Sequence, residues 1–209
     1  MTKNRKMIAV TFGVVALNLC AAASLAFAAD PVDKEYVRAL AVPGHFVFVM
    51  EYWQGNEKVV ARHGLKTEAP FTAVSATEFA INEDLHIALY GVEPCAGRFV
   101  SPGDRFDGSC DDYGRMQLQI FLRHPKVVYC RAFIEERLKA KQEAACYAHH
   151  HFPGALNSVD LLEDQLVSVG ALRLSHRADG SALRPDLEEA EKIAKHNRFG
   201  LWSRPQERP

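Results

Sequence analysis

The sequence predicts an α+β fold in which a small β-barrel is closed by helices. Segments rich in β-branched and aromatic residues recur between residues 45 and 148. One amphipathic helical pattern interrupts this run of strands, and further helical patterns follow it. Strands with one inserted helix, and helices at the end, are typical of α+β architecture.

The first 28 residues have the three parts of a secretory signal peptide. Three basic residues come first, residues 7–25 are apolar, and residues 26–28 read Ala-Phe-Ala, a small-x-small cleavage signal. We therefore expect a periplasmic or secreted protein with no stable membrane insertion once the signal is removed. The alternative is a membrane-anchored protein with an uncleaved helix, because residues 7–28 are roughly long enough to span a bilayer.

The charge balance bears on nucleic acid as a partner. The chain has 25 Lys+Arg and 26 Asp+Glu, and cleavage after Ala28 leaves 22 and 26, a formal net charge of −4. A protein that holds duplex DNA by its phosphates usually carries a basic excess. The composition therefore does not favour nucleic acid, although a local basic patch would still allow it.

Cysteine usage fits export. Cys20 lies in the signal, and four cysteines remain: Cys95, Cys110, Cys130 and Cys146. In an oxidising compartment they predict two disulfides, with three possible pairings. A structural zinc site is the alternative, but no pair has the short spacing that such sites favour.

The N-terminal part predicts a short helix over residues 29–43, which Pro43-Gly44 ends, and then a β-hairpin over residues 45–62. Strand regions follow at residues 71–81 and 85–92, and the glycine- and proline-rich residues 94–108 predict a loop. Asp111-Asp112 starts a helix that ends before Pro125. We then expect strands at residues 127–134 and 144–148, a loop at residues 149–154, and helices at residues 160–169 and 186–196.

Six short motifs from residue 71 onward carry a family resemblance. They are Tyr90-Gly-Val-Glu-Pro94, Cys110 with Gly114-Arg115, Val128-Tyr-Cys130, Ala144-x-Cys146, Leu166-Val-Ser-Val-Gly-Ala171, and Ala190-Glu191 with Phe199-Gly-Leu-Trp-Ser203. In this order they resemble motifs of the staphylococcal-nuclease-like (thermonuclease) family.

The resemblance implies a five-stranded OB-fold β-barrel with about three helices over residues 70–204. The signal peptide (1–28) and an extension with a β-hairpin (29–69) would precede this domain, and a tail (205–209) would follow it. It also implies the disulfides Cys95–Cys110 and Cys130–Cys146, the second between neighbouring antiparallel strands.

Calcium-dependent phosphodiester hydrolysis needs oxygen ligands, a general base and guanidinium groups that hold the phosphate. Ser75 and Thr77 stand where the family has two metal-binding aspartates, and Glu78 is one residue out of register. Ala88 stands at the first arginine. The general-base glutamate is missing after Pro94.

Two positions that are charged in the family keep their charge here on a different side chain. Glu93 stands at the turn aspartate and Lys141 at the second arginine, so Glu93 is a weak candidate for catalysis and metal binding and Lys141 for catalysis. Asp112-Tyr-Gly-Arg115 spells the family's catalytic-arginine motif, but it precedes Val128-Tyr-Cys130 when it should follow it. We therefore place Arg115 on the first helix of the domain.

Two further clusters could either bind a metal ion or lie in solvated loops. The run His149-His150-His151 could bind a metal, but a solvated loop is favoured because three adjacent histidines do not easily face one ion. Four aspartates beside the glycine-rich loop lack EF-hand spacing, so we expect a solvated loop and a helix cap at Asp104, Asp107, Asp111 and Asp112.

We therefore expect an exported, disulfide-bonded pseudoenzyme that acts as a binding or structural module for an unknown protein or ligand, without a cofactor. The alternative is a secreted calcium-dependent phosphodiesterase that cleaves DNA or RNA at a displaced active site.

Overall fold

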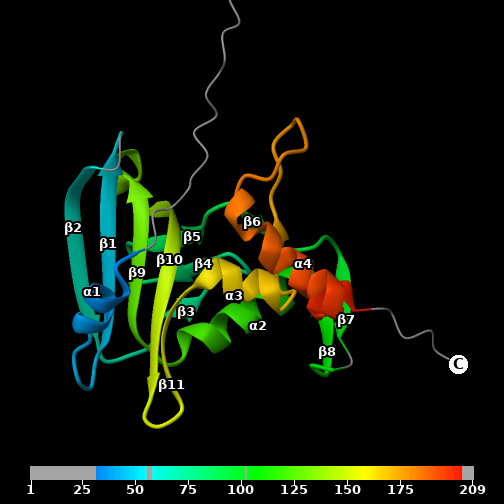
Figure 1. Ribbon diagram of the computed structural model, residues 1–209, viewed down its shortest axis with the longest axis horizontal. Helices are drawn as coiled ribbons and strands as arrows, with labels where there is room; N and C mark the ends of the chain where they lie inside the picture. Colours follow the sequence, from blue (N-terminus) through cyan, green and yellow to red (C-terminus); the bar gives the residue numbers. More distant parts are fainter. Residues whose placement is uncertain (1–31, 56–57, 102, 204–209) are drawn as a thin grey trace, which may run out of the picture.

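The computed structural model describes residues 32–55, 58–101 and 103–203 (Figure 1). The expected signal peptide and C-terminal tail lie outside these residues. Within them the architecture is α+β, as predicted: a large mixed sheet, two small two-stranded sheets and four α-helices.

The large sheet contains eight strands. Seven follow one another in the order β2 (Lys58–Thr67), β1 (Phe46–Gln54), β9 (Pro125–Phe133), β10 (Lys141–Phe152), β5 (His86–Leu89), β4 (Glu78–Ala80) and β3 (Thr72–Ala73). The eighth, β11 (Leu156–Leu161), folds back on the second half of β10. The pairs β1–β9 and β10–β5 are parallel, and the other pairs are antiparallel.

The described strands do not form the closed barrel that was expected. The hydrogen-bonded order runs from β2 to β3 and does not return to its start. A ring of β3, β4, β5, β10 and β9 would need β9 to pair with β3. Instead β9 pairs with β1 from Val47↔Val127 to Trp53↔Phe133, so the N-terminal hairpin occupies the edge at which the barrel would close.

The helices cover both faces of the sheet. α1 (Lys34–Ala39) places Val37 over the valines of β1 and β9, in a small core that also contains Tyr147. α2 (Cys110–Leu122), α3 (Leu162–Ser168) and α4 (Glu188–Asn197) pack into a larger core on the other face. α2 begins at Cys110 rather than at Asp111, because Ser109 caps it by accepting from Asp112 N. The two aspartates occupy its first turn, as predicted.

Short elements complete the fold. β6 (Val92–Glu93) pairs with β12 (Arg173–Leu174), and β7 (Arg98–Ser101) pairs with β8 (Phe106–Ser109). Three 3₁₀ turns, η1, η2 and η3, span Ile134–Leu138, Pro185–Leu187 and Gly200–Trp202.

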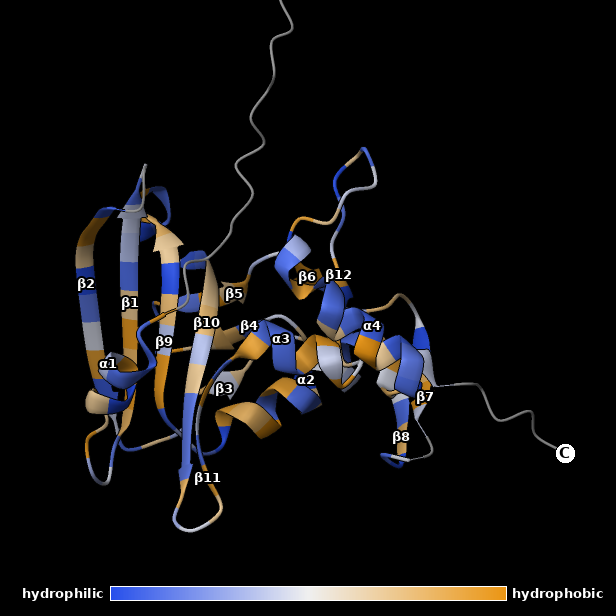
Figure 2. Ribbon diagram, viewed as in Figure 1, coloured by the Kyte–Doolittle hydropathy of each residue, from blue (hydrophilic) through white to orange (hydrophobic). Residues whose placement is uncertain are grey.

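Two expected loops are strands instead. Residues 98–101 and 106–109 pair as the β7–β8 hairpin, whose Phe99 and Phe106 pack on Tyr113 of α2. The histidine run lies in β10, which Figure 2 colours blue near its hairpin turn, because β9 and β11 supply backbone partners on both sides. The same pairing makes residues 156–161 a strand, so α3 starts at Leu162 rather than at residue 160.

Both expected disulfides are present. Cys95–Cys110 joins the chain after β6 to the first turn of α2, and Cys130–Cys146 joins β9 to β10 at paired positions of the ladder. Among the described helices, none has the length and apolar character needed to cross a membrane.

Candidate functional site

Three of the positions that the family resemblance singles out, Glu78, Ala88 and Lys141, lie on the outer face of β4, β5 and β10. The register places Glu78 and Glu143 on either side of Ala88. Residues opposite one another in neighbouring strands share a face, and so do residues two positions apart. We call the resulting set the outer face; it consists of Glu78, Ala80, His86, Ala88, Lys141 and Glu143.

Glu78 is the centre of this face. Its Oε1 lies 2.7 Å from His86 Nδ1, and its Oε2 accepts a hydrogen bond of 3.3 Å from Lys141 Nζ. Burial tends to raise the pKa of Glu78, but the hydrogen bonds from His86 and Lys141 outweigh burial and hold that pKa below its usual range. The one lysine of the face is therefore already paired with a carboxylate.

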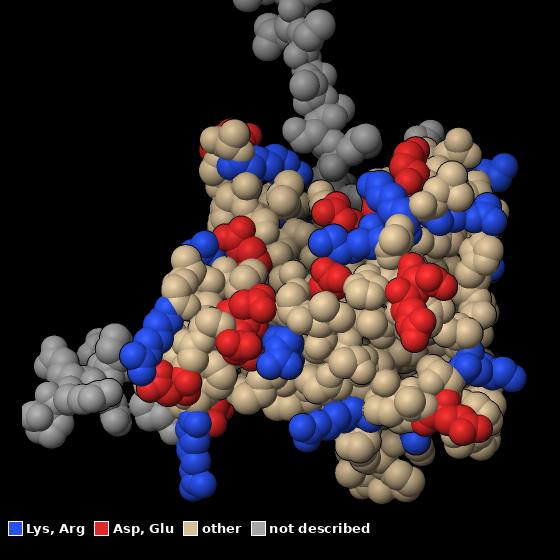
Figure 3. All heavy atoms as spheres, turned by 180° about the vertical axis from the view of Figure 1, so that it is seen from behind, with Lys and Arg blue, Asp and Glu red and all other residues tan. Residues whose placement is uncertain are grey.

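Two shallow cavities of about 350 and 270 Å³ adjoin the outer face. His86 and Glu83 line both cavities, and Asp84 and Lys141 line the smaller one. Together with Glu78 and Glu143, these residues give the region an acidic character. Figure 3 shows the back of the molecule, where acidic and basic side chains are interspersed.

The two weak catalytic candidates each have a separate partner. Glu93 on β6 makes an ion pair of 2.8 Å with Arg173 on β12, whereas Lys141 contacts Glu78. Among the described side chains, no ion pair joins Glu93 to Lys141. The part of the chain that the structure describes contains no group of three His, Cys, Asp or Glu side chains that could hold a metal ion.

Ser75 and Thr77, at the family's metal-binding positions, shape the turn that enters β4. Ser75 Oγ accepts from Thr77 N at 3.3 Å, and Ser75 N donates to Glu78 O at 3.1 Å. Arg115 lies on α2, as expected, where it is exposed and 3.5 Å from Asp112. The structure therefore gives Arg115 no contact with the outer face.

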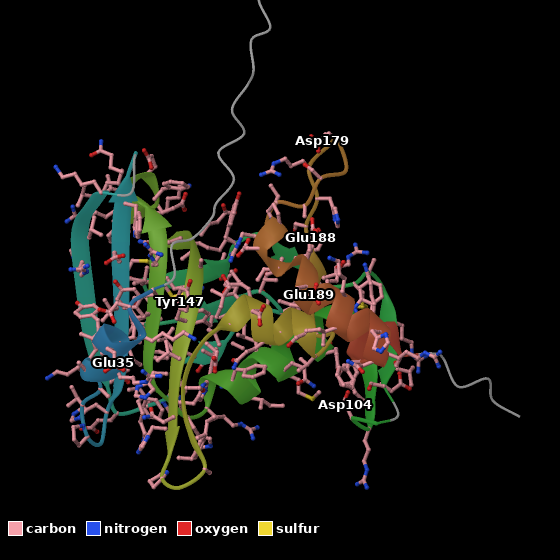
Figure 4. The ribbon with its side chains drawn as sticks, in the orientation of Figure 1. Glu35, Asp104, Tyr147, Asp179, Glu188 and Glu189 are labelled. Atoms are coloured by element: carbon pink, nitrogen blue, oxygen red, sulfur yellow. A yellow bond between two sulfur atoms is a disulfide. The ribbon has the colours of Figure 1, made fainter. Side chains whose placement is uncertain are left out.

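The four aspartates of the predicted solvated loop have different partners. Asp104 accepts from Ser101 and Tyr113, Asp107 from Arg98, Asp111 from Ala76 N, and Asp112 from Ser109. These contacts hold the β7–β8 hairpin and the start of α2. Figure 4 shows Asp104 beside this hairpin. The aspartates serve structure rather than one shared ion.

The histidines of β10 alternate in direction. His149 Nε2 lies 3.0 Å from Asn157 Oδ1 of β11, and His150 Nε2 lies 2.9 Å from the carbonyl of Phe121. Both side chains are buried, whereas His151 is exposed. Burial lowers the pKa of His149, and the contact with Asn157 only partly offsets this. The solvated loop predicted for these histidines is wrong.

A buried ionic cluster beside the outer face was not predicted. Arg184 and Glu163 are both fully buried, 3.7 Å apart, and Arg184 also forms two-pronged hydrogen bonds with Asp186. Glu163 accepts from Cys146 N, and Arg184 donates to the carbonyl of Tyr90. The cluster therefore fixes the end of β5 and the middle of β10, the strands that carry the outer face.

Glu51 is the centre of a second buried cluster, on the side of the sheet that α1 covers. It accepts hydrogen bonds from Arg62, Trp53, Tyr129 and Arg131, and the Arg131 guanidinium stacks 3.6 Å from the Trp53 ring. Burial and the nearby Glu51 carboxylate raise the pKa of Tyr129. These contacts attach the N-terminal hairpin to β9. The alternation of Glu51 with apolar neighbours on β1 was the only sequence signal for this cluster.

Comparison of the chain with protein-family models and with curated proteins finds no match.

Proposed function

We propose that this protein is an exported, non-hydrolytic module on a nuclease-like OB-fold scaffold, and that it binds or supports a partner. The strand order β3-β4-β5-β10-β9, with α2 between the third and fourth strands along the chain, supports an OB-type arrangement that is opened at one seam. The proposed relation to the staphylococcal-nuclease-like family rests on this order and on the six sequence motifs.

The observation that carries the proposal is the charge of the outer face. Ala88, at the position of a phosphate-binding arginine, lies between Glu78 and Glu143. Lys141, at the second arginine, is paired with Glu78. A phosphate brought to this face would meet two carboxylates and one neutralised ammonium group, so repulsion opposes its binding.

A transition-state clamp depends on donors that point at the developing negative charge. Removing a single such donor typically lowers the rate by about 10²–10³. Here one guanidinium position is occupied by a methyl group, and the other by an ammonium group that cannot form the planar bidentate contact. The outer face therefore suits a neutral or cationic group better than a phosphodiester.

Export supports the same role. Two disulfides and a signal-like N-terminus fit a periplasmic or secreted protein. The competing function is calcium-dependent hydrolysis at a displaced site that uses Glu93 and Lys141. Their separate ion pairs with Arg173 and Glu78 favour the binding role.

A hydrolysis assay tests the proposal. We would incubate the purified protein with calcium and either supercoiled plasmid or denatured DNA, beside a Glu93→Gln/Lys141→Ala variant and a Glu188→Gln/Lys192→Ala control on α4. We expect the same background for all three proteins and no effect of a chelator. Cleavage that needs calcium, and that the first variant loses but the control keeps, would overturn the non-hydrolytic role.

A further inference from the structure

The strand β2 leaves one side of its backbone without a partner among the described elements. It is ten residues long, pairs only with β1, and forms the first strand of the sheet. Figure 1 shows β2 at the outer margin of the molecule, with no described helix or strand beyond it. Its outward N–H and C=O groups can accept an added strand.

The other edges of the sheet have less backbone available for an added strand. β3, at the opposite end, has two residues. β11 has six residues and contacts both α1 and α3. Very short or covered edges are common protections against unwanted pairing. The long edge of β2 is therefore the exception in this sheet.

The side chains of β2 carry charge of one sign. Its ionisable residues are Lys58, Arg62, His63 and Lys66, and it has no acid. Arg62 is paired with Glu51. Lys58 and Lys66 are exposed, and within the described part of the chain neither makes an ion pair. The exposed side chains of Val60 and Leu65 add apolar contacts between the charged positions.

A second copy of the chain is a poor occupant of this edge. Pairing β2 with itself would bring the lysines and Arg62 of both copies together, and like charges across a ladder destabilise it. Lysine on an edge strand discourages self-pairing in the same way. An acidic strand, in contrast, would gain attraction at Lys58 and Lys66 as well as backbone hydrogen bonds.

We propose that β2 is a docking edge for an extended acidic segment of a partner protein, which adds to the sheet as a further strand. This inference rests on the proposed binding role and assigns it to the N-terminal hairpin. It explains why the hairpin replaces barrel closure: pairing of β1 with β9 moves the open edge of the sheet outward to a long basic strand.

Fluorescence anisotropy with a labelled ten-residue peptide of alternating glutamate and threonine or valine tests this inference. We expect saturable binding to the purified protein that weakens as salt rises, because exposed charges are screened. The variant Lys58→Glu/Lys66→Glu should bind at least about tenfold more weakly. The control variant Arg115→Glu/Lys192→Glu, with the same change in net charge, should bind like the wild type.

A second peptide separates strand addition from simple charge attraction. The same sequence with alternate backbone nitrogens methylated keeps its charge but loses donors needed for the ladder. We expect this peptide not to bind, and this arm needs no variant of the protein. Equal binding of the two peptides, equal binding to both protein variants, or no binding by the wild type would each overturn the inference. None of these results would change the outcome of the hydrolysis assay, so the two proposals fail separately.

Discussion

Gly91 and Arg184 lie so close together that a Cβ atom added to Gly91 would be 2.3 Å from Cγ of Arg184. Arg184 has no room to move away, because its guanidinium is hydrogen-bonded to Asp186 and to the carbonyl of Tyr90. Gly91 also has a φ of +75°, a region that other residues rarely adopt. The turn after β5 therefore depends on a glycine for two independent reasons.

The variant Gly91→Ala should lower the free energy of unfolding by about 2–4 kcal/mol, from backbone strain and from overpacking. Gly154→Ala is the matched control, because Gly154 has the same φ of +75° and no atom within 4 Å of the added Cβ. We expect the control to lose only about 1 kcal/mol, the strain component. Urea unfolding of both variants measures the difference, and equal losses would contradict the close contact.

The buried carboxyl of Glu163 should make stability depend on pH. Burial raises its pKa from 4.5 to about 7, against the opposing effect of Arg184. Because the folded state then holds the proton more tightly than the unfolded state, the contribution of Glu163 to stability is complete below about pH 4.5 and is lost as the pH rises through 7. The loss is on the order of 3 kcal/mol.

Glu163→Gln should flatten this dependence between pH 4.5 and 7, and Glu143→Gln on the exposed part of β10 should not. His149 has the opposite effect on stability. Burial lowers its pKa, so its contribution to the free energy of unfolding falls as the pH drops below about 6.5. For this reason the quantity to measure is the difference between variant and wild type in urea unfolding at each pH. A constant difference across the range would contradict the shifted Glu163.

The two disulfides should differ in their accessibility to reductant. Cys130 and Cys146 are fully buried, whereas Cys95 is half-buried and borders an open cavity of about 690 Å³. Under native conditions a dithiol should therefore reduce Cys95–Cys110 first, and mass spectrometry after alkylation will identify the modified cysteines. Labelling of Cys130 or Cys146 before Cys95 would contradict this order. Each bridge joins residues 15 or 16 positions apart, so loss of either should cost about 3 kcal/mol in unfolding free energy.

Removing the carboxylate of Glu51 should weaken the attachment of the N-terminal hairpin to β9. Glu51→Ala takes the shared acceptor from Arg62, Trp53, Tyr129 and Arg131, and breaking a buried ion pair typically costs about 3–5 kcal/mol. Glu51→Gln keeps one oxygen and should lose less. The exposed Glu35→Ala, which breaks only an i,i+3 pair with Arg38, should change stability by under about 1 kcal/mol. Urea unfolding followed by tryptophan fluorescence distinguishes these results; a loss for Glu51→Ala no larger than for Glu35→Ala would contradict the cluster.

Local patterns in the sequence predicted the elements whose signals lie within a few residues. The hairpin β1–β2 and the two aspartates in the first turn of α2 are examples, although the cap of α2 is Ser109 rather than Asp111. The disulfide pairs followed from the family resemblance. In contrast, the parallel pairing of β1 with β9 joins segments about 80 residues apart, such as Val47 and Val127, and no local pattern encodes it.

The wrong predictions have the same cause: local patterns do not encode contacts between segments that are distant in the sequence. His149 and His150 are polar, so the sequence predicted a loop; β11 and β9 make them a strand by offering backbone partners from both sides. No local pattern singled out Arg184 or Glu163, because each is unremarkable in its own segment. Only the fold brings them together, and Gly91 was the nearest sequence signal for that contact.

The acidic character of the outer face predicts what an arginine at position 88 would do. Ala88→Arg would place a guanidinium directly between Glu78 and Glu143, which flank it on β4 and β10. We expect a gain of about 0.5 kcal/mol in unfolding free energy, the usual size of an exposed cross-strand ion pair, and a smaller gain at high salt. Ala88→Glu is the matched control and should destabilise the fold, because it adds a third carboxylate. If the new arginine instead left stability unchanged and produced calcium-dependent cleavage of DNA, the carboxylates would not be holding it, and the face would still be organised to receive a phosphate.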